Sequence, residues 1–182
     1  MDRLLALIRD LCLLRAAPQD LPHSRSLFRN LLLLALAADL ATRWWLGVQD
    51  AGLLLIVMAF LLRLGLVSAL LHVAGRGERF LQTMSAMLAV GIVFTLLLAP
   101  VLHVLLPLPL PGEAPTSVQG LMGWLALGLI AWNVTVDGHV LRHALEIRLG
   151  QGVLVAVALL IVQFVASLML ARLLVGPAAV AA

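Results

Sequence analysis

The chain has 182 residues, of which 63% are hydrophobic and 12% are charged, and its formal net charge is +3. This apolar share lies well above the roughly 45–50% of soluble domains, so the composition excludes an ordinary soluble domain and indicates an integral membrane protein. A basic charge balance can indicate nucleic-acid binding, but here the basic residues adjoin apolar runs, so we expect no nucleic-acid partner. We expect a single all-α membrane domain.

Residues 1–29 precede the first long apolar run and are predicted to form a cytoplasmic amphipathic helix followed by a connector. Within residues 1–18 the apolar side chains fall on one helical face, whereas Arg3, Arg9 and Asp10 fall on the other. This pattern predicts a helix that lies in the membrane interface. A secretory signal is the alternative interpretation, but Arg9 and Asp10 interrupt what would be its apolar core.

Five apolar segments follow within a membrane domain at 30–175, each near the roughly 20 residues that a helix needs to cross the hydrocarbon core. They lie at about residues 30–48, 52–74, 80–106, 118–137 and 151–175. We expect a polytopic helical bundle in which the first two segments form a tight hairpin. Alternating prolines predict a stiff loop at 107–115, and we expect residues 176–182 to be a short outer tail.

The arginines predict the orientation of these segments. They precede the first segment and lie between the second and third and between the fourth and fifth, whereas the alternate loops at 49–51 and 107–117 have none. Because arginine-rich loops stay in the cytoplasm, we expect five crossings with a cytoplasmic N-terminus and a periplasmic C-terminus. All twelve basic residues are arginine and tyrosine is absent, a bias associated with GC-rich bacterial genomes, so we expect a bacterial inner membrane.

Three ionisable residues lie at membrane depth. Asp39 and Arg43 are four residues apart and share one helix face, and Arg63 lies midway along the second segment. In an antiparallel hairpin Asp39 and Arg63 would lie at similar depth, so we expect them to pair while Arg43 reaches the outer surface. The pair either fixes the packing of the helices or contacts a partner, or it belongs to a path for an ion or a substrate.

Small residues recur at four-residue spacing on the third segment, at Gly91, Thr95 and Ala99. Small residues at this spacing allow another helix to approach closely. We therefore expect this face to pack against another segment of the chain or against a second protein.

The connector after the fourth segment is rich in ionisable residues. His139, His143 and Glu146 recur at spacings that place them on one helix face, and two imidazoles with a carboxylate can bind zinc. We favour a different interpretation, in which this helix end enters the cytoplasmic headgroup layer and no metal or other cofactor is bound. The arginines expected to contact lipid headgroups are Arg76, Arg79, Arg142 and Arg148.

Two short motifs carry a resemblance to a known family. Asp20, Leu21 and Pro22 stand just before the first segment, and the fourth segment runs WNVTVDGHVLRHAL from Trp132 to Leu145 into a glycine-containing turn. Together with five segments and an amphipathic N-terminus, this pattern resembles bacterial members of the Yip family. The resemblance implies a five-span membrane protein and does not imply a defined activity.

The sequence leaves two classes of function open. The one we favour is a non-enzymatic scaffold or accessory protein that binds lipids, a partner membrane protein or a second copy of itself. The alternative is a small transporter or channel subunit that uses Asp39, Arg43 and Arg63. We expect no enzymatic activity, because no catalytic triad, paired carboxylates or glycine-rich phosphate loop occurs at a common depth.

Overall fold

The computed structural model of the chain describes residues 2–48, 53–106 and 116–175. Within these ranges the fold is all-α, as predicted, and no strand occurs. The α-helices are α1 (Asp2–Cys12), α2 (Arg25–Leu46), α3 (Leu53–Val73), α4 (Phe80–Leu105), α5 (Ser117–Leu145) and α6 (Leu149–Val175), and the 3-10 helices are η1 (Pro18–Asp20) and η2 (Gly77–Arg79). The predicted loops at 49–51 and 107–115 and the predicted tail at 176–182 fall wholly or mainly outside the described residues.

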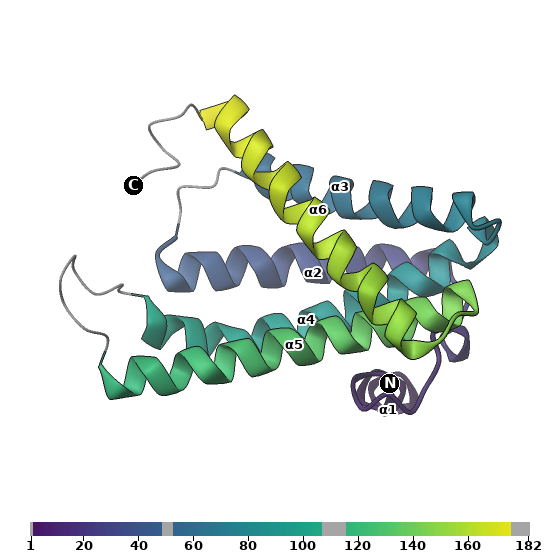
Figure 1. Ribbon diagram of the computed structural model, residues 1–182, viewed down its shortest axis with the longest axis horizontal. Helices are drawn as coiled ribbons and strands as arrows, with labels where there is room; N and C mark the ends of the chain where they lie inside the picture. Colours follow the sequence, from purple (N-terminus) through teal and green to yellow (C-terminus); the bar gives the residue numbers. More distant parts are fainter. Residues whose placement is uncertain (1, 49–52, 107–115, 176–182) are drawn as a thin grey trace.

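The axes of the long helices α2, α3, α4 and α5 are roughly aligned, α6 crosses them obliquely, and α1 is seen end-on below α5 (Figure 1). α4 lies at the centre and packs against α2 and α5, and α5 in turn packs against α6. The core follows from this arrangement, because the run from Thr83 to Val90 on α4 is buried throughout.

Four helical segments are long and apolar enough to cross a membrane: Leu53–Val73, Gly77–Leu105, Ser117–Leu145 and Leu149–Leu170. They coincide with the second to fifth predicted segments. The first predicted segment forms α2, which is not among the four and carries more charged residues, among them Arg29, Asp39 and Arg43. The coarser prediction, an all-helical chain with several helices long and apolar enough to cross a membrane, is thus confirmed.

α5 is longer than its predicted segment, which ended at Asp137. The helix continues to Leu145 because the helical conformation buries Val140, Leu141 and Ala144. Burial of these apolar side chains favours a helix over an exposed loop. α5 ends where Glu146 adopts a left-handed conformation with φ of 59°. The ionisable residues up to Leu145 are therefore helical rather than part of a connector.

The predicted tight hairpin of α2 and α3 is wrong. α2 packs against α4, whereas α3 packs against α6 and α4, and α2 and α3 barely touch each other. Polar side chains of both helices, Asp39 and Arg43 on α2 and Arg63 on α3, line a space between them, which explains why the two helices do not close on each other.

The closest helix approach is between α5 and α6. A Cβ atom on Gly138 would lie 2.7 Å from the Cα of Val153, and one on Gly152 would meet the carbonyl of Gly138. The predicted close-packing face on α4 is not formed at Gly91, where a Cβ atom would meet open space. Small residues thus allow close packing in this bundle, but at the α5–α6 crossing.

α1 lies against α4 and α5 and is anchored by hydrogen bonds from α5. Leu11 is fully buried, whereas Leu5 is 61% exposed, so only part of the apolar face is covered by the protein. The indole of Trp132 donates a hydrogen bond of 3.0 Å to the Cys12 carbonyl, and the imidazole of His139 donates one of 2.8 Å to the Ala16 carbonyl. These bonds satisfy carbonyls at and beyond the end of α1.

Candidate ligand-binding cavity

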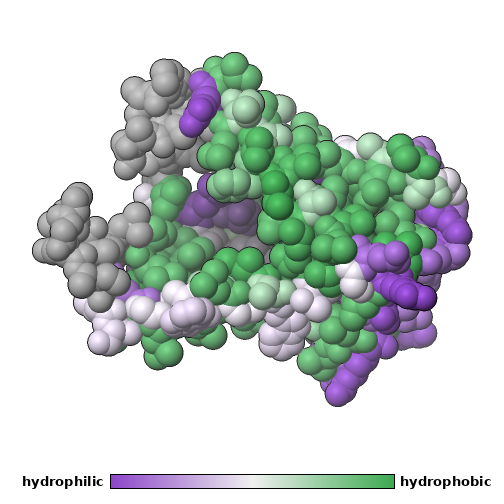
Figure 2. All heavy atoms as spheres, viewed as in Figure 1, coloured by the Kyte–Doolittle hydropathy of each residue, from purple (hydrophilic) through white to green (hydrophobic). Residues whose placement is uncertain are grey.

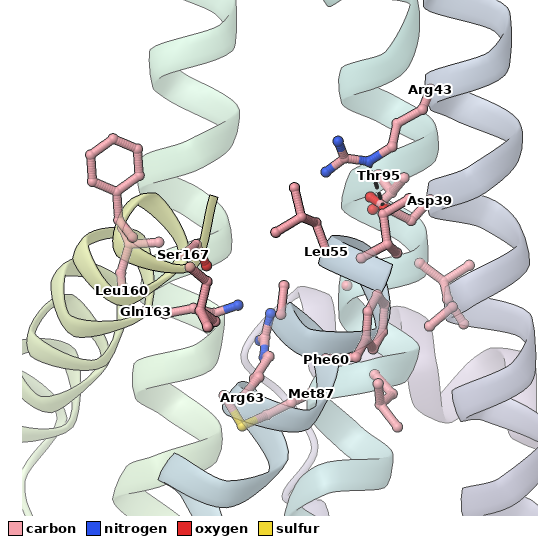
Figure 3. A pocket seen from close by; sticks show the side chains of 18 residues that line it. Asp39, Arg43, Leu55, Phe60, Arg63, Met87, Thr95, Leu160, Gln163 and Ser167 are labelled. Atoms are coloured by element: carbon pink, nitrogen blue, oxygen red, sulfur yellow. Dashed lines mark hydrogen bonds and ion pairs between the residues drawn. The ribbon is translucent and has the colours of Figure 1, made fainter. Parts of the chain in front are cut away.

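A cavity of about 470 Å³ lies between α2, α3, α4 and α6. In the space-filling view a hollow opens on the face of the molecule between α6 and α5, and hydrophilic atoms lie inside it (Figure 2). The side chains that line the cavity come from all four helices and point toward a common space (Figure 3). Its polar lining residues are Asp39, Arg43, Arg63, Thr95, Gln163 and Ser167.

Asp39 and Arg43 form an ion pair within α2. The Arg43 Nε donates a hydrogen bond of 2.9 Å to the Asp39 Oδ2, as their four-residue spacing predicts (Figure 3). Both side chains remain about one-third exposed, at 30% and 39%. The predicted pairing of Asp39 with Arg63 is therefore wrong, because the nearer partner of Asp39 lies on its own helix.

Arg63 pairs instead with Asp137 of α5. The Arg63 Nη2 donates a hydrogen bond of 2.9 Å to the Asp137 Oδ2, and the side chains are 29% and 13% exposed. Arg63 lies ten residues from either end of α3, or about 15 Å along the axis, which places this pair near the middle of the helix. The Asp137 Oδ1 is buried and has no hydrogen-bond partner among the described residues.

Sequence reasoning missed Asp137 as a partner because it placed this residue at the end of the fourth segment. A signal was present, since the run from Val136 to Leu145 contains no proline and helical propensity allows it to continue. With α5 extended to Leu145, Asp137 lies eight residues, or about 12 Å, from the helix end. That distance is close to the depth of Arg63 from the same end of the bundle.

A second, smaller cavity of about 60 Å³ adjoins the first. Arg63, Met87, Leu160 and Gln163 line both cavities, and Asp137 lines the smaller one. Arg63 therefore lies in the wall between the two cavities, with its ion pair on the side of the smaller one.

The two ion pairs leave the cavity balanced in charge and rich in hydrogen-bond donors. The positive charges of Arg43 and Arg63 are matched by the negative charges of Asp39 and Asp137. Each guanidinium carries five N–H donors and has one hydrogen bond to its carboxylate partner in the structure. The remaining N–H groups can therefore bind the acceptor atoms of a ligand.

The arginine-rich end of the bundle is held together by Glu146. Arg76 and Arg79 bond its two carboxylate oxygens at 2.5 and 2.6 Å. Arg79 also donates hydrogen bonds of 3.1 and 3.2 Å to the carbonyls of His143 and Ala144, which lie in the last turn of α5. The hydrogen bonds from Arg79 and Arg76 hold the pKa of Glu146 below its ordinary value.

The alternative metal cluster of His139, His143 and Glu146 is not formed. The two imidazole rings lie edge to face at 4.8 Å, but the Nε2 of His139 is bonded to Ala16, and Glu146 faces Arg76 and Arg79. Because α5 ends before Glu146, the helical spacing that predicted a shared face does not apply. Over residues 2–48, 53–106 and 116–175 no group of three potential metal-binding side chains is found.

No protein family, curated protein or solved structure matches this chain. The functional interpretation therefore comes from the cavity and from the charges around it.

Proposed function

We propose that this chain is a five-span, non-enzymatic membrane protein whose cavity binds an amphiphile, such as a membrane lipid, from within the bilayer. One observation carries this proposal: a charge-balanced and donor-rich cavity lies beside apolar helices and is hollowed toward the face between α5 and α6. A ligand that diffuses in the membrane reaches such a cavity without first passing through water.

The proposal treats α2 as the first of five spans, beside the four apolar helices. Its 22 residues extend about 33 Å, which matches the hydrocarbon thickness. It packs against α4, its axis is roughly aligned with that of α4 (Figure 1), and the charges of Asp39 and Arg43 neutralise each other. An arginine-rich end with α1 on the cytoplasmic side of a bacterial inner membrane agrees with the positive-inside rule.

The lining of the cavity favours a ligand with both polar and apolar parts. Acyl chains alone would leave the N–H groups of Arg43 and Arg63 without acceptors, and unsatisfied polar groups in hydrocarbon are costly. Leu55, Phe60 and Phe164 offer an apolar surface beside them. A headgroup with several acceptor oxygens and an attached hydrocarbon chain satisfies both parts of the lining.

A cavity-filling variant tests this function. Gly91 lines the cavity and a Cβ atom there meets open space, so Gly91→Leu should fill the cavity without disturbing the packing of the helices. Gly128→Leu makes the same change on the exposed face of α5, where a Cβ atom also meets open space. Delipidated protein should be titrated with phospholipid and the bound lipid counted by native mass spectrometry.

We expect Gly91→Leu to weaken binding of the most tightly held lipid by at least about tenfold, or about 1.4 kcal/mol. Gly128→Leu should bind like the parent protein. Equal lipid binding by all three proteins would show that the cavity is not the binding site.

A second candidate function is transport, with Asp39, Arg43 and Arg63 along the path. The observation that favours it is the small cavity beyond Arg63, because a side chain between two cavities can separate two compartments of a path. Flux of a labelled amphiphile between the leaflets of proteoliposomes tests this function. Flux that Gly91→Leu abolishes supports transport, whereas binding without flux supports the accessory role.

The proposed kinship with bacterial Yip proteins rests on Asp20, Leu21 and Pro22 and on the run Trp132–Leu145. In the structure Leu21 is 2% exposed, and the Oδ2 of Asp20 accepts a hydrogen bond from the Ala17 N–H, so the first motif lies in a packed turn. In the scaffold or accessory role, the exposed faces of α5 and α6 can bind a partner membrane protein or a second copy of the chain.

A further inference from the structure

A second hollow lies at the arginine-rich end of the bundle, where α5 turns into α6. Its volume is about 400 Å³, and it is separate from the cavity described above. The residues that line it are Gln19, Arg79, Arg142, His143, Glu146, Ile147, Arg148 and Leu149.

The charges of this hollow are not balanced. Three arginines line it, with Glu146 as the one carboxylate in the lining, and Glu146 is already bonded to Arg79 and to the neighbouring Arg76. The Oδ2 of Asp20, in the adjacent η1, accepts a hydrogen bond from the backbone N–H of Ala17. The positive charges of Arg142 and Arg148 therefore have no carboxylate partner in the described part of the chain.

The two arginines differ in their surroundings. Arg148 is exposed and its side chain makes no hydrogen bond or ion pair within the described ranges. Arg142 is half-buried, and its Nη2 donates to the Nε2 of His143 at 3.3 Å. Its Nε is buried without a hydrogen-bond partner in the described structure, and no carboxylate balances the charge of this guanidinium.

The start of α6 adds backbone donors to the same hollow. α6 begins at Leu149, and the first N–H groups of a helix have no acceptor within the helix. The backbone N–H of Arg148, just before the helix, donates a hydrogen bond of 3.1 Å to the Oε1 of Gln151. The positive end of the helix dipole thus lies beside two arginines that lack a counter-charge.

We propose that this hollow binds a phosphate group, carried either by an anionic lipid headgroup or by a soluble phosphate compound. Guanidinium groups match the oxygens of a phosphate and form charge-assisted hydrogen bonds with them. A helix start supplies further N–H groups to the same kind of anion. The hollow also lies at the end of the apolar helices, where lipid phosphates are found.

The test uses the full-length protein in detergent with two probes, the short-chain lipid dioctanoyl phosphatidic acid and inorganic phosphate. Arg142→Gln with Arg148→Gln removes both unpaired charges of the hollow. The matched control is Arg25→Gln with Arg29→Gln, which removes two exposed charges near the start of α2, with no ion pair within the described ranges. Arg148→Gln alone serves as a second variant, because its side chain is exposed and its loss should not affect folding.

We expect the double variant of Arg142 and Arg148 to weaken phosphatidic acid binding by at least about tenfold, and Arg148→Gln alone to weaken it by several-fold. The control should bind within about twofold of the parent protein. Equal losses in the control and in the double variant would show attraction by net charge alone and would overturn the proposal, as would unchanged binding in both.

The two probes identify the source of the phosphate. Competition by inorganic phosphate that depends on Arg148 assigns the site to a soluble phosphate compound, whereas binding of phosphatidic acid without such competition assigns it to a lipid headgroup. Gly91→Leu should leave both results unchanged, because Gly91 lines the other cavity. Loss of phosphate binding and loss of the proposed cavity function are thus distinguishable.

Discussion

Replacing Asp137 with asparagine removes the carboxylate bonded to Arg63 and leaves a guanidinium without a counter-charge near the middle of α3. Asp137→Asn keeps the size of the side chain, so the change is mainly electrostatic. This variant tests whether the ion pair between α3 and α5 contributes to the free energy of unfolding. Asp39→Asn is the matched control, because it removes the carboxylate of the other ion pair.

The structure sets the size of the expected effect. Breaking a fully buried ion pair by removing one partner costs about 3–5 kcal/mol. Because the Arg63 side chain is 29% exposed, we expect a cost just below this range, at about 2–3 kcal/mol. Arg43 lies three residues before the end of α2 and can extend to the interface, so Asp39→Asn should cost about 1 kcal/mol or less.

The free energy of unfolding in mixed micelles, measured by titration with a denaturing detergent, compares these variants. The double replacement Arg63→Met with Asp137→Met removes both charges and should recover stability to within about 1 kcal/mol of the parent protein. If Asp137→Asn proved no more costly than Asp39→Asn, or if the double replacement gave no recovery, the assignment of Asp137 as the partner of Arg63 would be wrong.

Three further predictions concern the α5–α6 crossing, the arginine-rich end and the N-terminal helix. Gly138→Ala should lower the free energy of unfolding by about 1–3 kcal/mol, whereas Gly128→Ala should not; equal melting temperatures would contradict the close crossing. Since its pKa is lowered on folding, Glu146 should stabilise the protein fully above its ordinary pKa of 4.5 and lose this effect as the pH falls through the lowered value. The melting temperatures of the parent protein and of Glu146→Gln should then differ by a constant amount from pH 7 to pH 5 and converge at lower pH, and parallel profiles would contradict the assignment. His139→Ala should speed amide hydrogen exchange at residues 13–17 without changing the zinc content, and a fall in bound zinc would restore the metal hypothesis.

The parts of this fold that could be predicted from sequence depend on local pattern. Apolar runs of sufficient length predicted the long helices, and the N-terminal pattern predicted a helix where α1 forms. That α1 lies in the membrane interface stays a prediction. The four-residue spacing of Asp39 and Arg43 is a local relation too, so the contact between these two side chains follows from helix geometry. In each case the residues that decide the outcome lie close together in the chain.

The parts that could not be predicted depend on which helices are neighbours. Arg63 lies 74 residues from Asp137, and no local pattern says that α3 approaches α5 rather than α2. The sequence singled out Asp39, Arg43 and Arg63, which line the space between α2 and α3. Leucines that face lipid and leucines that face protein look alike in sequence, so the space itself could not be predicted. Ser24 caps the start of α2 and Gly47 caps its end, so the limits of the helix follow from local sequence. These caps do not determine which helix α2 packs against.

The partners of Glu146 could not be predicted from the sequence either. Its spacing from His139 and His143 suggested a shared helix face, but the left-handed backbone at Glu146 ends the helix and the carboxylate lies against Arg76 and Arg79. Two arginines from the preceding loop offer a stronger electrostatic partner than two imidazoles do. The clustering of ionisable residues was therefore predicted, whereas their partners were not.

The central claim is that α2 crosses the membrane and makes an odd number of spans with the four apolar helices. It is tested most directly by fusing one reporter before Met1 and another after Ala182, each active on only one side of the inner membrane. We predict activity of the cytoplasmic reporter at the N-terminus and of the periplasmic reporter at the C-terminus. Activity of both ends on the same side would place α2 outside the bilayer and contradict the five-span account.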